Sequence, residues 1–329
     1  MSLATSLEAR RSSQTWLVWV ALWTVYIVWG STYLAIRVTV ETLPPLITAG
    51  VRFVVAGGIM YAWLAFRRGR ASLRISRREA ASCALIGGGL LLGGNGLVVL
   101  AERDVSSSLA ALVIASVPLW VVLLRAVNGD RASKGTLLGV ALGFFGVALL
   151  VLPGGNGDGQ LFGVFLLIAA SAIWATSSFM SPRVSLPKDP FTSTAFQMLF
   201  GGLWCAAGGL AMGEAGNIDV ESFSRASILA LVYLIGAGSL AAFTAYVWLL
   251  QNAPISKVAT YAYVNPVIAL VLGWLILSET ISATMLVGAA IIVASVAFIV
   301  TRESGARKAA KKPLEPVPER IAELAPKSP

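Results

Sequence analysis

Long apolar stretches separated by short polar connectors dominate the chain. The first runs from Trp16 to Ile36, and its 21 residues would span about 31 Å as a helix, the thickness of a bilayer's hydrocarbon core. The stretches are continuously apolar and do not alternate with a period of two, so each is predicted to be a helix and not a barrel strand. The pattern predicts ten such helices, near residues 16–36, 46–66, 80–100, 107–126, 135–152, 160–182, 191–212, 226–249, 256–277 and 282–301.

Composition supports an all-α integral membrane protein. Hydrophobic residues make up 57% of the chain and charged residues 12%, whereas soluble domains carry about 25% charged residues. Histidine is absent, which excludes imidazole catalysis, histidine metal ligation and a histidine proton relay. Cys83 and Cys205 fall inside apolar stretches and are expected to be free, buried thiols. No metal site and no cofactor are predicted.

The distribution of positive charge predicts how the chain crosses the membrane. The net charge is +9, but the basic residues lie on alternate connectors and not in a soluble basic domain, so no nucleic-acid partner is expected. With the N-terminus in the cytoplasm, 21 of the 25 Lys and Arg residues lie on the cytoplasmic side, three lie outside and Arg52 lies within a span. The positive-inside rule then places both termini in the cytoplasm and the protein in the plasma or inner membrane.

The polar residues that interrupt the apolar pattern recur in two halves of the chain. Trp29-Gly30-Ser31 corresponds to Trp174-Ala175-Thr176, Pro45 to Pro190 and Arg52 to Gln197, each pair 145 positions apart (174 − 29, 190 − 45 and 197 − 52). Five helices per half is an odd number, so the second half is predicted to be inverted relative to the first. Inverted repeats are typical of secondary transporters.

This repeat defines the expected domains. They are a cytoplasmic N-terminal segment at 1–15, a first five-helix repeat at 16–152, a loop at 153–159, a second five-helix repeat at 160–301 and a disordered cytoplasmic tail at 302–329.

Arg52 is the most informative polar residue, because a positive charge at this depth costs several kcal/mol and needs a polar cavity or a partner. It is either a structural arginine bonded to helix-end carbonyls or an anchor for a carboxylate or other anion of a substrate. Gln197 at the equivalent place suggests a shared inward face. The hydroxyls of Ser31 and Thr176, beside bulky indoles, suit either ligand binding or close helix packing.

Further candidates come from prolines, tyrosines and amides inside the apolar stretches. Pro118 and Pro266 are predicted to bend their helices and to act as hinges or gates. Tyrosines in these stretches suit an aromatic pocket, although tyrosine also occurs at bilayer interfaces. The complete set of predicted substrate-binding residues is Trp29, Ser31, Tyr33, Arg52, Asn95, Trp174, Thr176, Gln197, Tyr261, Tyr263 and Asn265.

Acidic residues are missing from the middle of the predicted spans. Glu102 and Glu279 stand near segment ends, and proton-coupled carriers commonly use a carboxylate at depth. The expectation is therefore uniport or exchange, or coupling through a route that the sequence does not show. An intramembrane enzyme would need a nucleophile, a metal site or a carboxylate pair at depth, none of which is visible, so no enzymatic activity is predicted. The Gly135, Gly139 and Gly143 run is interpreted as a helix-packing face.

With ten helices, two repeats and the Trp29-Gly30-Ser31 start, the chain resembles the EamA-type transporters of the drug/metabolite transporter superfamily. The ends of the fourth and ninth segments, Gly129-Asp130-Arg131-Ala132-Ser133 and Ser278-Glu279-Thr280-Ile281-Ser282, are similar to the family pattern Gly-Glu-Arg-hydrophobic-Ser. They depart from it at Asp130, Ser278 and Thr280. The resemblance implies a carrier whose central cavity is lined by helices one to four and six to nine. It would place near that cavity Trp29, Arg52, Trp174, Gln197, Tyr261 and Asn265.

The function expected from sequence is therefore secondary transport. The leading hypothesis is an exporter of small metabolites such as amino acids, working by alternating access between the two repeats. A broad drug or metabolite efflux carrier and a non-transporting membrane scaffold are the alternatives. The expected partners are a small-molecule substrate and membrane lipid, with monomer and homodimer both left open.

Overall fold

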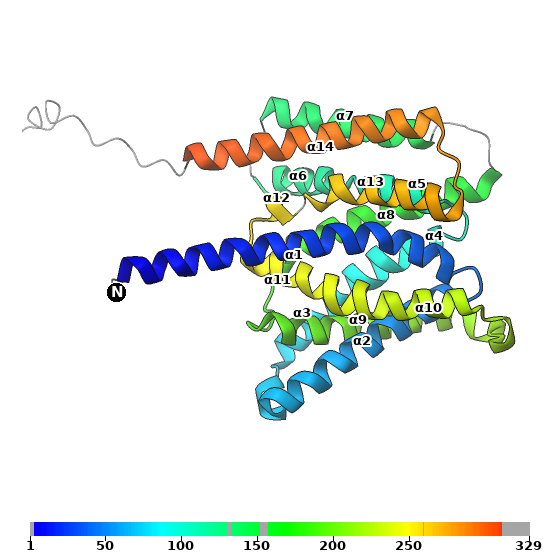
Figure 1. Cartoon of the computed structure of the whole chain (residues 1–329), viewed down its shortest axis with the longest axis horizontal. Coiled ribbons are helices and arrows are strands. Elements are labelled where there is room, and N and C mark those ends of the chain that lie inside the picture. The colour runs from blue at the N-terminus through cyan, green and yellow to red at the C-terminus, as the bar shows by residue number, and fades with distance from the viewer. Residues whose placement is uncertain (1–2, 130–132, 152–156, 259, 311–329) are drawn as a thin grey trace, which may run out of the picture.

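The computed structural model describes residues 3–129, 133–151, 157–258 and 260–310, and over these residues the chain is helical with no strand (Figure 1). Two of the long apolar segments contain a π-helical stretch between α-helical ends. The elements of the first half are α1 (Leu3–Thr39), α2 (Pro45–Arg68), α3 (Arg77–Gly87), a π-helical stretch (Gly88–Gly96), α4 (Leu97–Ala101), α5 (Ser107–Ile114), α6 (Val117–Val127) and α7 (Lys134–Val151).

The described residues of the second half are helical as well. Its elements are α8 (Gly157–Met180), α9 (Pro190–Ala211), α10 (Arg225–Tyr233), a π-helical stretch (Leu234–Phe243), α11 (Thr244–Asn252), α12 (Ile255–Val258), α13 (Tyr261–Leu277) and α14 (Ala283–Ala310). Short 3-10 turns occupy Arg70–Leu73, Ser181–Arg183, Glu214–Asn217 and Val220–Ser222.

The helices are those of a membrane protein. Within the described residues seven helical segments are long and apolar enough to cross a bilayer, and three shorter apolar helices cover 134–149, 264–277 and 283–299. Many large apolar side chains face outward, among them Phe66 at 89% exposure and Leu229 at 68%. Such a surface suits contact with lipid tails and not with water.

Two terminal helices extend beyond the boundaries expected from hydropathy. Helix α1 begins at Leu3 although the apolar stretch begins at Trp16, and α14 continues to Ala310 although its apolar stretch ends near residue 301. Helical hydrogen bonding therefore continues into segments that composition alone marks as polar. Residues 152–156 of the predicted inter-repeat loop, and 311–329 of the predicted tail, lie outside the described residues.

Corresponding helices of the two halves pack against each other. Helix α2 lies along α9, and α7 lies along α14 at the opposite side of the molecule (Figure 1). Glycines allow the close contact between α2 and α9. A Cβ at Gly50 would lie 2.8 Å from Ala206 N, and one at Gly202 would lie 2.7 Å from Val54 N. Without a hydrophobic driving force between helices in lipid, such close packing is a main source of association.

The predicted glycine face of the fifth segment also packs within the chain. A Cβ at Gly139 would lie 2.8 Å from Ile299 of α14, and one at Gly143 would lie 2.6 Å from Leu119 of α6. The interpretation of this run as a packing face is confirmed.

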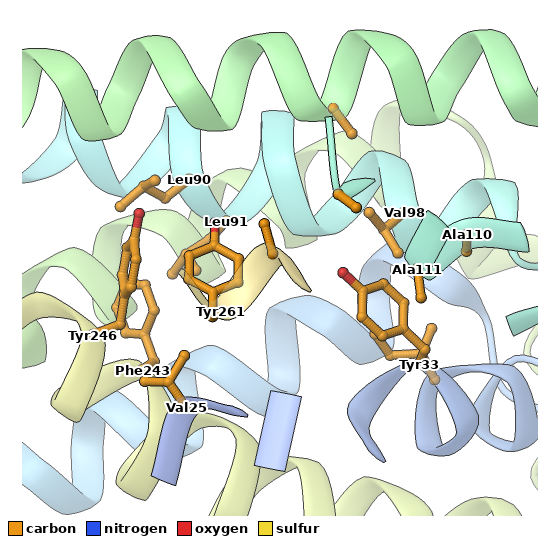
Figure 2. Packing of buried hydrophobic residues seen from close by; sticks show 14 of the residues in the cluster. Val25, Tyr33, Leu90, Leu91, Val98, Ala110, Ala111, Phe243, Tyr246 and Tyr261 are labelled. Carbon is orange, nitrogen blue, oxygen red and sulfur yellow. The ribbon is translucent and has the colours of Figure 1, made fainter. Parts of the chain in front are cut away.

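The core between the two packed pairs is built around α1 and α8. Val25 and Tyr33 of α1 belong to one cluster of buried residues that also contains Leu90 and Leu91, and Tyr33 lies beside Val98 and Ala111 (Figure 2). Both cysteines are buried and free, as predicted.

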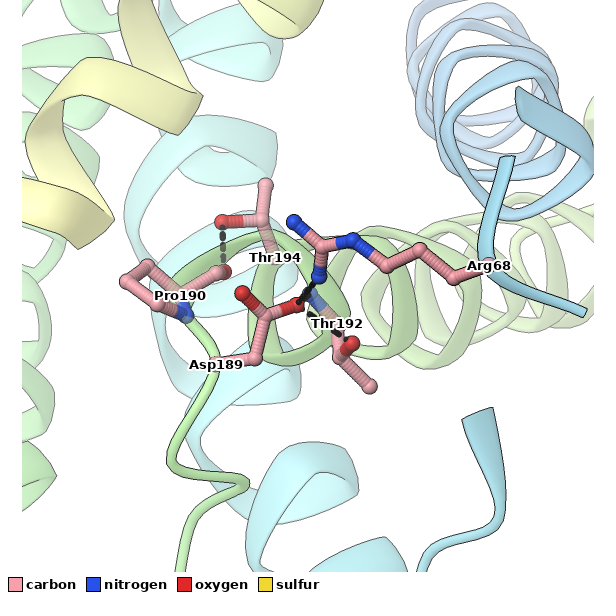
Figure 3. Close-up of polar contacts among 5 residues, drawn as sticks. All are labelled: Arg68, Asp189, Pro190, Thr192 and Thr194. Carbon is pink, nitrogen blue, oxygen red and sulfur yellow. Dashed lines mark hydrogen bonds and ion pairs between the residues drawn. The ribbon is translucent and has the colours of Figure 1, made fainter. Parts of the chain in front are cut away.

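Acidic side chains cap several helix ends. Asp189 accepts a hydrogen bond from Thr192 N at 2.9 Å at the start of α9, and Arg68 approaches it at 3.0 Å (Figure 3). Glu214 accepts from Leu46 N at 3.0 Å and Ile47 N at 2.8 Å at the start of α2. These carboxylates satisfy backbone donors that have no partner within their helix.

Candidate functional site

A cavity of about 60 Å³ lies at the centre of the helix bundle, where both halves contribute side chains. By volume it has room for a few water molecules. The residues that line it come from α1, α2, the first π-helical stretch, α4, α5, α8, the second π-helical stretch and α13. They are Trp29, Thr32, Tyr33, Ile36, Arg52, Phe53, Leu91, Gly94, Asn95, Val98, Ile114, Ala170, Trp174, Gly238, Phe243 and Tyr261.

Arg52 supplies the charge of this cavity. It is only 4% exposed, and Nε donates to Ser239 Oγ at 2.9 Å while one terminal nitrogen approaches Asn95 Oδ1 at 3.5 Å. The guanidinium also lies over the Phe53 ring, 4.6 Å from its centroid. None of these partners is charged, and among the described residues no carboxylate forms an ion pair with Arg52. The cavity therefore holds a buried cation without a counter-ion, which is suited to an anionic group of a ligand.

Trp29 and Trp174 meet at the cavity wall, one from each half. Their ring centroids lie 5.4 Å apart, edge to face, and Trp29 is also 5.4 Å from Tyr261. The Trp29 indole N–H donates to Gly238 O at 3.4 Å, and that of Trp174 donates to Tyr246 Oη at 3.0 Å. Because protein partners satisfy the indole N–H groups, what remains for a ligand is their apolar ring surface.

Tyr246 is a buried support for this aromatic wall. Its hydroxyl contacts Ser178 Oγ at 2.7 Å as well as Trp174, and its ring lies 4.8 Å from that of Trp29. Tyr246 and Tyr261 lie close to each other in the core, beside Leu90 and Leu91 (Figure 2).

The structure brings six of the predicted binding residues together around the cavity: Trp29, Tyr33, Arg52, Asn95, Trp174 and Tyr261. It places four others elsewhere. Ser31 Oγ contacts Tyr233 Oη at 2.5 Å, and Thr176 is exposed and donates to Ala172 O. Gln197 is buried and donates to Ser193 Oγ at 2.9 Å.

Asn265 is buried, and with its amide in the orientation that its neighbours favour it donates to the carbonyls of Tyr26 and Tyr261. It therefore bonds helix backbone and not the cavity. The side chain of Tyr263 lies outside the described part of the chain. For all eleven predicted residues, those at the cavity included, a role in binding stays a prediction.

The two prolines differ in their surroundings. Pro118 stands in the first turn of α6, directly after the break that separates α5 from α6. Pro266 lies inside α13, and there the segment is interrupted earlier, between Val258 and Tyr261. In both segments an interruption of regular α-helix precedes the proline, which is a suitable place for a hinge.

Sequence reasoning missed several residues of the site, notably Ser239 and Gly238. A Cβ at Gly238 would lie 2.9 Å from an Arg52 terminal nitrogen, so the glycine leaves room for the guanidinium. Ser239 is a polar residue in an apolar, glycine-containing stretch, and the same signal that selected Asn95 could have found it. The described residues contain no group of three or more Cys, Asp or Glu that could hold a metal ion.

Comparison with known proteins agrees with this architecture. The model of the EamA-like transporter family matches residues 15–152 and again 161–301. The uncharacterized inner membrane transporter YedA of Escherichia coli (strain K12) is 36% identical over 284 residues, which cover 85% of this chain and 89% of that protein. A probable amino-acid metabolite efflux pump of the same strain is 26% identical over 283 residues, covering 82% and 89%.

A solved crystal structure superposes with a TM-score of 0.62 at 22% identity, covering 88% of this chain and 98% of the other, which supports the fold alone. The double family match falls on the two halves that meet at the cavity, and it spans most of the chain. The chain belongs to the EamA-like transporter family.

Proposed function

We propose that this protein exports small metabolites, amino acids in the first place, by alternating access at the cavity around Arg52. The observation that carries the proposal is a buried guanidinium without a counter-ion, set beside aromatic rings from both halves of the chain. A carboxylate would pair with Arg52, and an apolar side chain would lie against Trp29 and Trp174. The relative described as a probable amino-acid metabolite efflux pump supports this substrate class.

The proposal takes the chain as ten spans in two inverted repeats, with both termini cytoplasmic. Structural features recur with nearly the 145-residue spacing of the sequence repeat: π-helical stretches begin at Gly88 and Leu234 (234 − 88 = 146), and α6 and α13 begin at Val117 and Tyr261 (261 − 117 = 144). The pairing of α2 with α9 and of α7 with α14 supports the same relation. Two such halves rocking about a central site would expose the cavity to each side in turn.

The small size of the cavity suits a conformation in which the site is closed around little more than water. An amino acid would need the halves to separate, as alternating access requires. The breaks before Pro118 and before Tyr261 would absorb that movement.

A broad efflux carrier is the second candidate. The aromatic lining by Trp29, Tyr33 and Phe53 favours it, because flat apolar surfaces accept many ring-bearing ligands. The two candidates differ in their need for the guanidinium, since a neutral drug has no group to pair with Arg52.

The test is a flux screen in proteoliposomes, with radiolabelled amino acids, sugars and neutral aromatic drugs, on wild type, Arg52→Gln and Arg52→Lys. Loss of a hydrogen bond to a charged group costs about 1.5–3 kcal/mol, or roughly ten- to a hundredfold in apparent affinity for a carboxylate substrate. Arg52→Lys should keep part of the activity because it keeps the charge.

Arg70→Gln is the matched control, since Arg70 is exposed on the turn after α2. Amino-acid transport that is unchanged in Arg52→Gln would remove Arg52 from the site. Transport of neutral drugs alone would favour the broad efflux carrier.

A further inference from the structure

Glu102 continues the cavity-lining face of its helix beyond the cavity itself. It follows α4 directly, and its backbone N–H donates to Val98 O at 2.9 Å, so it stands one helical turn beyond Val98. Val98 and Asn95 both line the cavity. The sequence places Glu102 at a segment end, where a carboxylate would ordinarily face water.

The structure instead buries Glu102 completely. Its side chain is 0% exposed, and neither carboxylate oxygen has a hydrogen-bond partner among the described residues. The other buried or half-buried glutamates at the described helix ends accept hydrogen bonds with both carboxylate oxygens. Glu214 caps α2, and Glu279 accepts from the backbone N–H groups of Ser107 and Ser108 at 2.8 and 3.1 Å and from both serine hydroxyls. Capping therefore accounts for those two carboxylates but not for Glu102.

The groups that face Glu102 do not compensate a negative charge. From α1, Arg37 donates to the backbone carbonyls of Glu102 and Arg103 and not to the carboxylate, and Tyr33 lies close enough to interact electrostatically. From the connector before α14, Glu279 adds a second negative charge. Burial, and then Glu279, raise the pKa of Glu102 well above its ordinary value, and Arg37 opposes them only in part. The surroundings of Glu102 therefore favour the neutral form of its carboxyl group over the charged form.

We propose that Glu102 binds the proton whose entry drives export of the substrate. This inference rests on the proposed function and its topology, which put Glu102 at the outer end of the bundle, and it replaces the expectation of uniport that its position at a segment end suggested. A neutral Glu102 can remain buried, as it is here, whereas a charged one favours a conformation that exposes it to water. Protonation thus favours closure of the outer end.

Because the protonation of Glu102 favours closure of the outer end, a proton and a substrate can be exchanged across the membrane. A proton from outside binds to an oxygen of the ionised carboxylate after the substrate has left, and the outer end closes. Once the cavity opens to the cytoplasm, the proton leaves through it, because Glu102 lies one turn from the cavity wall, and the substrate binds. One proton enters for each substrate exported, and no other bond is made or broken.

The first test needs no substrate. Acid–base titration of the purified full-length protein is compared between wild type and Glu102→Gln. An unperturbed glutamate has a pKa of about 4.3, so between this value and the raised pKa of Glu102 wild type should hold a proton that Glu102→Gln does not. Equal titration curves above pH 5 would overturn the proposal.

The second test measures coupling in proteoliposomes with the membrane potential held at zero. The probe is the radiolabelled L-amino acid that wild type carries fastest in the flux screen. For one proton per substrate, each unit of pH difference supports up to about tenfold accumulation, because one unit of pH and a tenfold concentration ratio are equal in free energy. Glu102→Gln should abolish this accumulation and keep exchange of labelled for unlabelled amino acid.

Glu102→Asp should restore accumulation, since it keeps a titratable group. Glu41→Gln is the matched control, because Glu41 is an exposed glutamate on the connector between α1 and α2, and it should retain accumulation. Accumulation in Glu102→Gln equal to wild type would overturn the coupling role even if the titration step is present. A wild type that moves no probe while the titration step persists would instead overturn the proposed function, so the two failures are distinguishable.

Discussion

Gly57 and Gly58 are neighbours in α2, and their replacement by alanine should have opposite effects on stability. A Cβ at Gly57 would lie 2.9 Å from Leu199 N, 3.0 Å from Ala195 O and 3.0 Å from the Leu199 side chain, all on α9. A Cβ at Gly58 would meet nothing within 4 Å. Because two of the three obstacles at Gly57 are backbone atoms, rotation of a side chain cannot relieve the contact.

The expected difference in the free energy of unfolding follows from a comparison of the two variants. Both gain the helical preference of alanine over glycine, about 1 kcal/mol, so this contribution cancels in the comparison. What remains is the overpacking at Gly57, about 1–3 kcal/mol. We expect Gly58→Ala to be slightly stabilised and Gly57→Ala to melt below it by several degrees, at roughly 2–4 °C per kcal/mol.

The assay is thermal denaturation of the detergent-solubilised protein, followed by the loss of its monodisperse chromatographic peak. The proteoliposome flux of both variants serves as a second readout, since α2 carries Arg52 and any shift of α2 against α9 moves the guanidinium. Equal melting temperatures, or a Gly57→Ala variant more stable than Gly58→Ala, would refute the close α2–α9 packing described here.

Three further results are expected. Glu214→Gln should lose the acceptor for one of its two backbone donors on α2 and be destabilised by about 1–3 kcal/mol, while Glu221→Gln at an exposed site should melt like wild type. Burial raises the pKa of Asp189, but hydrogen bonds from Thr192 and Arg68 outweigh it and lower the pKa overall, so the cap of α9 stabilises the fold fully above about pH 4 and less as the pH falls further. The melting temperature of Asp189→Ala should therefore lie below that of wild type at pH 7 and approach it near pH 2. Cys83, which is buried, should react with a membrane-permeant maleimide only after denaturation.

Much of the architecture could be predicted from hydropathy because lipid restricts the alternatives. A continuous apolar stretch of bilayer length has to be helical, and the described helices follow the predicted stretches closely. The meeting of Trp29 with Trp174, and of Arg52 with Asn95, agrees with expectation because polar or indole groups in apolar helices turn toward the bundle interior.

The repeat was a weaker guide to individual side chains. Gln197 has the same position in the second half as Arg52 in the first, yet it bonds Ser193 within its own helix. Thr176 likewise corresponds to Ser31 but is exposed. An equivalent position in the sequence repeat predicts the helix to which a residue belongs. Which face of that helix lines the cavity depends on how the helix is tilted and packed.

Glu102 shows most clearly what sequence could not provide. Its position after an apolar stretch predicts a solvated carboxylate, whereas the structure buries it, with Arg37 and Tyr33 of α1 and Glu279 of a distant connector within electrostatic range. These contacts join parts of the chain that are far apart in sequence. Hydropathy shows where along the chain an apolar helix ends. It does not show which other parts of the chain cover that end.

The two π-helical stretches explain how a single charge can be held where the two halves of the chain meet. Asn95 of the first stretch and Ser239 of the second both contact Arg52, so each half supplies one neutral hydrogen-bond partner to the same guanidinium. Gln197, which holds the place of Arg52 in the second half of the chain, bonds Ser193 and does not line the cavity. The site is therefore asymmetric: Arg52 comes from the first half of the chain, and its hydrogen-bond partners come from both halves. Because π-helical turns are frequent at functional sites, the bonds from Asn95 and Ser239 are the ones that movement of the two halves should break or form first.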